Sequence, residues 1–199
     1  MPRLSLTDFV DIVSASGTPK MRKVAEIKKR QDYEPAFDFY KMIRDWIIDV
    51  HRDNHPKSTI QNILPRLQDA KKKSVYPIII KGYNKWWGRK FLNWFDPPSE
   101  LFSQHGIDIS VNPELGLYID GSPHLIKLYF KAEKLTKNRI DIIIHLMDIT
   151  LVGECPVGTA MSVLDVRQAK FISPTVSIPN LAASVSAELA YISTLWDQI

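Results

Sequence analysis

The chain alternates apolar and polar residues along three short stretches, 107–111, 115–119 and 126–131. Because successive side chains of a β-strand point to opposite faces, this period of two predicts three strands of one sheet with a shared apolar face. The last two stretches flank Asp120-Gly121, a pair that favours a tight hairpin turn. The other face would carry acids, tyrosines and lysines, so we expect it to be either a solvated surface or a site.

Other parts of the chain follow the period of three to four residues that is typical of amphipathic helices. The clearest helical pattern covers about 35–52, and another helix is expected to begin at Pro77 and to end near Gly88. Thr136 is placed to cap a helix that ends near residue 149. A further strand or a hairpin is expected at 162–166 and 170–172, and a last helix after Pro179.

This order of elements predicts the α/β (α+β) class, with a mostly antiparallel sheet flanked by helices and an N-terminal helical lobe. We expect a basic helical lobe at 1–98 and an α/β domain at 99–199, packed together as one unit. The longest apolar runs are too short to span a bilayer, so no membrane partner is expected. A single cysteine and the lack of signal-peptide features indicate the cytoplasm as the expected location.

The net charge of +4 conceals an asymmetry between the two halves of the chain. Residues 1–99 carry 19 Lys and Arg against 11 Asp and Glu, whereas residues 100–199 carry 7 against 11. Six basic residues lie within 20–30, and seven lie within 70–95, where there is no acid at all. Charge grouped in this way creates a local field that attracts a polyanion.

The run around residues 76–90 combines this charge with aromatic residues. On a helical wheel the tyrosine and tryptophans fall on one side, and the basic residues on the other. Four basic residues of this run are therefore candidates for contacts with the phosphates of DNA or RNA: Lys81, Lys85, Arg89 and Lys90. The alternatives are a solvated ridge with no ligand, or aromatic residues that stack on unpaired bases: Trp87, Phe91, Trp94 and Phe95.

Pro113-Glu114 begins the second of the three strands, and the third runs from about His124 to Lys131. With the order of elements, these residues resemble the core of the PD-(D/E)XK nuclease-like superfamily over about 100–175. The resemblance implies a restriction-endonuclease-like core. In active members acids hold Mg²⁺, and a lysine on the returning strand positions or activates the attacking water.

Carried onto this chain, the resemblance implies Glu114 and Lys131 as catalytic residues, and Glu114 with Asp120 or Glu133 as ligands of Mg²⁺. An active protein would be a metal-dependent phosphodiesterase, that is, a nuclease. The chain departs from the pattern at Tyr129, which stands where the family has an acid two residues before the lysine. A phenol is a poor Mg²⁺ ligand at neutral pH, so we expect a degenerate metal site and leave enzymatic activity open.

A different class of function remains open beside this one. The oppositely charged halves of the chain suit self-association into a homo-oligomer, or a non-enzymatic interaction with another protein, without any nucleic acid. The acids and lysines of the sheet would then be ordinary cross-strand pairs that serve stability alone.

Overall fold

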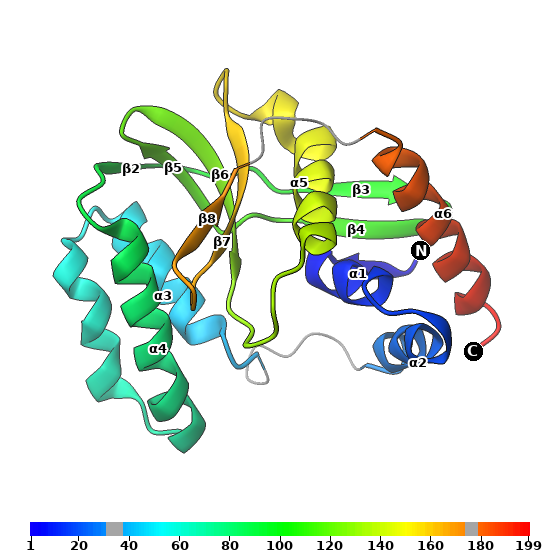
Figure 1. Ribbon diagram of the computed structural model, residues 1–199, viewed down its shortest axis with the longest axis horizontal. Helices are drawn as coiled ribbons and strands as arrows, with labels where there is room; N and C mark the ends of the chain where they lie inside the picture. The colour runs from blue at the N-terminus through cyan, green and yellow to red at the C-terminus, as the bar shows by residue number, and fades with distance from the viewer. Residues whose placement is uncertain (31–37, 174–178) are drawn as a thin grey trace.

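A five-stranded sheet lies at the centre of the protein and is covered by helices on both faces (Figure 1). The computed structural model describes residues 1–30, 38–173 and 179–199. The strand order is β2 (Leu92–Phe95), β5 (Leu115–Ile119), β6 (Ser122–Tyr129), β7 (Ala160–Asp165), β8 (Lys170–Ile172). Neighbouring strands are antiparallel except β6 and β7, which are parallel. The α/β (α+β) class and the mostly antiparallel sheet are therefore confirmed.

A second, three-stranded sheet has the order β1 (Arg3–Ser5), β4 (Ile107–Val111), β3 (Glu100–Gln104). The expectation that 107–111 lies in one sheet with the two following strands is therefore wrong. The reason is the two-residue turn His105-Gly106, in which both residues have positive φ (52° and 74°). This turn folds β4 back onto β3, and β1 pairs in parallel with the other edge of β4.

The hairpin of β5 and β6 forms as the Asp-Gly pair predicts. Ile119 faces Ser122 across a two-residue turn, and Asp120 and Gly121 have φ values of 50° and 92°. Two positive φ angles give the turn the twist that antiparallel strands need. The hairpin thus brings the start of β5 beside the middle of β6, which positions the candidate site.

One group of helices packs with the three-stranded sheet and one face of β6: α1 (Leu6–Val13), α2 (Gly17–Lys28), α5 (Lys137–Leu151) and α6 (Leu181–Trp196). Ser5 begins α1 by accepting a hydrogen bond of 3.0 Å from the backbone N of Asp8. Thr136 begins α5 in the same way, with 3.4 Å to the backbone N of Arg139. These side chains satisfy backbone donors that the first helical turn leaves free.

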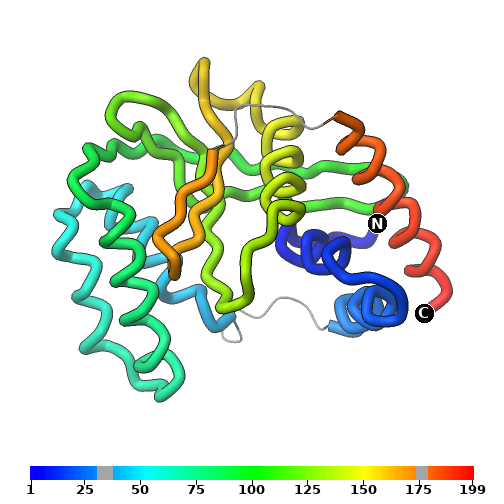
Figure 2. Tube along the Cα trace, viewed as in Figure 1, coloured from blue at the N-terminus to red at the C-terminus, as the bar shows by residue number. Residues whose placement is uncertain are grey.

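The opposite face of the five-stranded sheet is covered by α3 (Lys41–Arg52), the 3₁₀ helix η2 (Lys57–Arg66) and α4 (Ala70–Trp87). In Figure 2 these segments, cyan to green, lie on the left, whereas the two ends of the chain lie together on the right. The first 98 residues therefore contribute to both hydrophobic cores. The boundary between 98 and 99 stays a prediction, since both cores combine residues from either side of it.

The expected polar face of the sheet is not solvated. Leu125 and Tyr129 of β6 belong to one core, whereas Ile126 and Leu128 belong to the other. Lys127 shares the side of Tyr129 and is only 8% exposed. Helices α1 and α5 cover this side, so its polar groups must find partners within the protein.

Helix α4 begins at Ala70, seven residues before the expected start at Pro77. The side chain of Asp69 accepts a hydrogen bond of 2.8 Å from the backbone N of Lys72 and caps the first turn. Pro77 lies exposed within the helix, where its missing N–H removes one helical hydrogen bond. Helix α3 begins at Lys41, and the start expected near residue 35 lies outside the described residues.

Candidate functional site

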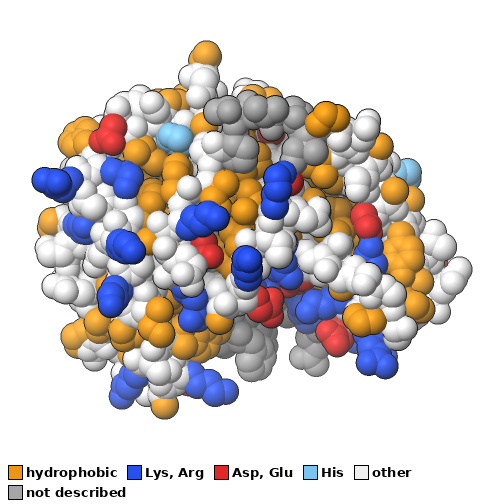
Figure 3. All heavy atoms as spheres, viewed as in Figure 1, with side chains coloured by type: hydrophobic (Ala, Val, Ile, Leu, Met, Phe, Trp, Pro, Cys, Tyr) orange, Lys and Arg blue, Asp and Glu red, His pale blue; other side chains and the backbone are white. Residues whose placement is uncertain are grey.

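The outward side of α4 carries a row of basic side chains, which we call the basic ridge: Lys71, Lys81, Lys85 and Arg89. All four are exposed, and Arg89 continues the row just beyond the end of the helix. Lys81 and Lys85 lie one helical turn apart, about 6 Å along the axis. None of the four forms an ion pair with any residue that the structure describes. Lys and Arg side chains gather on the left of Figure 3, where α4 lies.

The inward side of α4 fixes the ridge in place. Four side chains of α4 are buried in the core between this helix, α3 and the five-stranded sheet: Tyr76, Ile79, Tyr83 and Trp86. The hydroxyl of Tyr83 lies 2.6 Å from Nε2 of His51 on α3. Burial lowers the pKa of His51 to about 4 and raises the pKa of Tyr83 well above its ordinary value. The pair is therefore neutral near pH 7, and the core that packs under the ridge carries no charge at this pair.

The four residues expected to contact phosphates do not have equal access to solvent. Lys81, Lys85 and Arg89 are exposed. Lys90 is half-buried, because its ammonium donates to the carbonyl O of Trp86 and lies 5.5 Å from the centroid of that ring. Lys90 thus stabilises the end of α4, and the basic ridge passes through the other three.

Part of the second basic run, at residues 20–30, is paired within the fold. Lys20 pairs with Glu188 at 2.5 Å, and Arg30 pairs with Asp8 at 2.9 Å. Lys28 donates to backbone carbonyl oxygens near the end of α6. These cations hold α2 and the residues just after it against α1 and α6, whereas Arg22 and Lys29 of the same run are exposed and form no ion pair with a described residue.

The aromatic residues around the end of α4 differ sharply in exposure. Trp87 packs against the ring of His51, with centroids 4.5 Å apart, and Trp94 and Phe95 are also partly buried. Phe91 is different, since 67% of its surface is exposed. Of the four aromatic residues that could stack on bases, Phe91 is thus the most accessible.

Glu114, at the start of β5, is bound on both carboxylate oxygens. Its Oε1 lies 2.7 Å from the ammonium of Lys127, and its Oε2 accepts a 2.7 Å hydrogen bond from the backbone N of Leu128. The ammonium also donates to the carbonyl O of Asn112 at 2.8 Å. The side chains of Glu114 and Lys127 are each 10% exposed. The lysine that meets Glu114 is therefore Lys127, on β6, and not the expected Lys131.

The other two expected metal ligands lie elsewhere. Asp120 is at the opposite end of β5 from Glu114, about 20 Å away along the strand. Its Oδ1 accepts a 2.9 Å hydrogen bond from the backbone N of Phe91. The side chain of Glu133 is 72% exposed and lies 3.8 Å from the guanidinium of Arg139. The structure therefore does not bring Glu114 and Asp120 together, and one metal ion cannot bind both.

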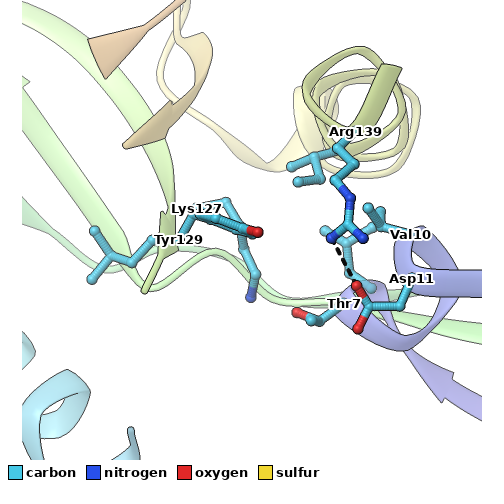
Figure 4. A pocket seen from close by; sticks show the side chains of 9 residues that line it. Thr7, Val10, Asp11, Lys127, Tyr129 and Arg139 are labelled. Atoms are coloured by element: carbon cyan, nitrogen blue, oxygen red, sulfur yellow. Dashed lines mark hydrogen bonds and ion pairs between the residues drawn. The ribbon is translucent and has the colours of Figure 1, made fainter. Parts of the chain in front are cut away.

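Lys131 follows the end of β6 and binds a carboxylate on α1, on the side of the sheet that Lys127 and Tyr129 also face. Its ammonium lies 2.5 Å from Oδ2 of Asp11, on α1. Oδ1 of the same carboxylate lies 2.8 Å from the guanidinium of Arg139, on α5. Figure 4 shows this ion pair facing Lys127 and Tyr129 across a cavity of about 20 Å³. The cavity has room for a water molecule but not for a nucleotide.

Tyr129, which stands where the family has an acid, is 7% exposed. Its hydroxyl donates a 3.0 Å hydrogen bond to the carbonyl O of Glu133. Burial raises the pKa of Tyr129 above its ordinary value. The phenol therefore keeps its proton at neutral pH and is unsuited to bind a divalent cation.

Within residues 1–30, 38–173 and 179–199 there is no group of three or more His, Cys, Asp or Glu that could hold a metal ion. Glu114 is paired with an ammonium, and Asp11 with an ammonium and a guanidinium. A divalent cation needs unneutralised oxygen ligands, and here basic side chains already occupy the places beside these carboxylates.

The sequence reasoning missed three members of these clusters: Asp11, Lys127 and Arg139. Lys127 could have been found, since it stands across the Asp-Gly hairpin from Glu114 when residues are counted back from the turn. Asp11 and Arg139 lie on helices far apart in sequence, and only the packing of α1 on α5 brings them together. No local pattern signals such a contact.

Comparisons with protein-family models, with curated proteins and with solved structures found no match to this chain. Among the described residues, no helix combines the length and the apolar character needed to cross a membrane. The geometry of the ridge and of the buried ion pairs is therefore the basis for a functional assignment.

Proposed function

We propose that the protein binds nucleic acid through the basic ridge on α4, on a PD-(D/E)XK-like core whose metal site is degenerate. The observation that carries this proposal is the exposed, unpaired state of Lys71, Lys81, Lys85 and Arg89. The single cysteine supports a reducing compartment, and we propose the cytoplasm as the place of action.

The physical basis is the release of counterions from a polyanion. Each phosphate that a Lys or Arg neutralises frees condensed cations, which makes binding favourable and dependent on salt. Cations already paired with carboxylates contribute little, because binding would first have to break those pairs. This argument favours the ridge residues over Lys20 and Arg30, which are paired with carboxylates.

The arrangement of the sheet supports the likeness to the PD-(D/E)XK superfamily. Three strands in antiparallel order, β2, β5 and β6, are followed by α5 and then by β7, parallel to β6. Glu114 stands at the start of the middle strand, where that family has its first acid. The partner of Glu114 on the returning strand is Lys127, and Tyr129 is two residues further on.

The position of Lys127 beside Glu114 supports a degenerate metal site. In an active member a second acid on the returning strand would share Mg²⁺ with Glu114. Here an ammonium lies 2.7 Å from Glu114 and supplies the positive charge itself. A divalent cation would be repelled by this ammonium, so we propose that binding is retained without catalysis.

The first experiment compares two charge reversals of equal size by fluorescence anisotropy with labelled DNA and RNA. Lys81→Glu with Lys85→Glu removes the centre of the ridge, and Arg22→Glu with Lys29→Glu is the matched control at exposed positions of the second basic run. We expect the ridge variant to bind more weakly and its salt slope to fall by about 1.5 to 2. Equal affinity for the ridge variant and the unmodified protein would refute the proposal.

A cleavage assay with Mg²⁺ or Mn²⁺ tests the degenerate metal site. We expect no metal-dependent cutting of single- or double-stranded DNA or RNA, because the ammonium of Lys127 opposes a metal at Glu114. Cutting that is lost in both Glu114→Ala and Lys131→Ala would instead establish a nuclease. A salt-sensitive oligomer without any binding of nucleic acid would favour self-association.

A further inference from the structure

We infer that Phe91 is a stacking platform for an unpaired base, so that the preferred ligand of the basic ridge is single-stranded nucleic acid. This inference rests on the proposed function and specifies its ligand. The starting observation is that Phe91 is 67% exposed and lies two residues beyond Arg89, the last cation of the ridge. Phe91 thus presents an aromatic ring to solvent close in the chain to cations that form no ion pair with a described residue.

The backbone of Phe91 is held rigidly although its ring is free. Its N–H donates to Oδ1 of Asp120 at 2.9 Å, and its carbonyl O accepts from the backbone N of Asp120 at 2.9 Å. Leu92, the next residue, packs toward the core, so the alternation of the strand directs Phe91 the opposite way. The ring cannot reach the core without breaking β2, and its exposure is therefore built into the fold.

Two cations lie near the end of α4, between the ridge and this ring. Arg89 is exposed, and its Cα lies at most about 7 Å from that of Phe91 along the chain. Lys57 donates from its ammonium to the carbonyl O of Gly88 at 2.9 Å, which places a further cation at the end of α4. The carboxylate nearby, Asp120, already accepts the N–H of Phe91.

An exposed ring next to the basic ridge favours single-stranded nucleic acid over a duplex. A planar ring binds a base by stacking on its face, and in a duplex both faces of an interior base are already covered by its neighbours. Phosphates can then follow the ridge from Arg89 to Lys85 and Lys81 while a base rests on Phe91. Stacking requires no particular base, so we expect little sequence preference.

The test uses the full chain and four variants at exposed positions. Phe91→Ala removes the ring, Phe91→Leu keeps an apolar side chain without a flat face, and Phe91→Trp keeps the flat face. Leu101→Ala, on β3, is the matched control, since Leu101 is 45% exposed. Affinities are measured by anisotropy for oligothymidine and oligouridine of about 15 nucleotides, and for a hairpin duplex.

We expect Phe91→Ala and Phe91→Leu to weaken single-strand binding by about tenfold or more, with an unchanged salt slope. Phe91→Trp and Leu101→Ala should keep single-strand affinity, and the duplex should bind more weakly to the unmodified protein. Full affinity of Phe91→Leu, or a preference for the duplex, would overturn the inference. If only the charge reversal at Lys81 and Lys85 weakens binding, the proposed function stands and the stacking platform does not. If neither change weakens binding, both fail.

Discussion

The ammonium of Lys127 lies 2.7 Å from Oε1 of Glu114 in a place where each side chain is only 10% exposed. Lys127 stands on β6 and Glu114 immediately precedes the neighbouring strand β5, and Leu128 donates its backbone N–H to the second carboxylate oxygen. A pair this well buried cannot lose one member without leaving a charge that water does not reach.

We therefore expect Lys127→Met to lower the free energy of unfolding by about 3 kcal/mol. The double variant Lys127→Met with Glu114→Gln should recover part of this loss, because the amide still accepts from Leu128 and no charge remains buried. Urea unfolding of both single variants and the double variant gives the coupling energy. A loss of less than about 1 kcal/mol for Lys127→Met would mean that the pair behaves as if it were on the surface.

The same pair predicts how a metal site could be restored. Lys127→Glu would place a second carboxylate opposite Glu114, and two facing carboxylates suit Mn²⁺ or Mg²⁺. We expect Mn²⁺ to raise the melting temperature of Lys127→Glu, since a ligand of the folded state stabilises it. The unmodified protein and the neutral variant Lys127→Gln should not respond. If Lys127→Glu folds but its melting temperature does not depend on Mn²⁺, Glu114 is not in the place of a metal ligand.

The parts of the fold that the sequence predicts are those that depend on neighbours in the chain. Asp120-Gly121 forms the expected turn, and Thr136 caps α5, because each signal acts over a few residues. The strand at 107–111 was predicted, but its sheet was not. Its partners, β1 and β3, carry short patterns, and the turn at His105-Gly106 lacks the usual Asn or Asp.

In the candidate site, too, the features set by local sequence could be predicted and those set by contacts between strands and helices could not. The solvent-facing side of the basic ridge follows from helical periodicity, and Lys81, Lys85 and Arg89 are exposed as expected. The partner of Glu114 does not follow, because the lysine was chosen by its match to a family motif. Counting back from the Asp120-Gly121 turn places Lys127 beside the carboxylate, as the register of β5 on β6 confirms, whereas Lys131 reaches Asp11.

Gly82 sets the distance between α4 and the turn after β7. A Cβ built on it would lie 1.9 Å from the carbonyl O of Val166, which is backbone and cannot rotate away. We expect Gly82→Ala to lower the free energy of unfolding by about 2 kcal/mol, although alanine favours the helix by about 1 kcal/mol. Gly153→Ala, in η3 (Val152–Glu154), is the control, since nothing lies near its Cβ and no such loss should appear in urea unfolding. If Gly82→Ala leaves the free energy of unfolding unchanged, α4 is free to shift, and the position of the basic ridge is not fixed by this contact.

His51 should make the stability depend on pH. Its pKa falls from 6.5 to about 4 in the folded protein because of burial, and Tyr83 holds it by a 2.6 Å hydrogen bond. Between these pH values the unfolded chain takes up a proton at His51, and the folded chain does not. This contribution is complete above pH 6.5 and is lost as the pH falls toward 4, and the loss amounts to about 3 kcal/mol.

The variant His51→Gln isolates this effect, because its amide can accept from Tyr83 but does not titrate. Urea unfolding at a series of pH values should show a smaller loss of stability between pH 6.5 and 4 for His51→Gln than for the unmodified protein. His55→Gln is the matched control at an exposed position. Parallel profiles for His51→Gln and the unmodified protein would show that burial does not lower the pKa of His51. Below that pKa the core under the ridge would be charged, and Tyr83 would accept the hydrogen bond instead of donating it.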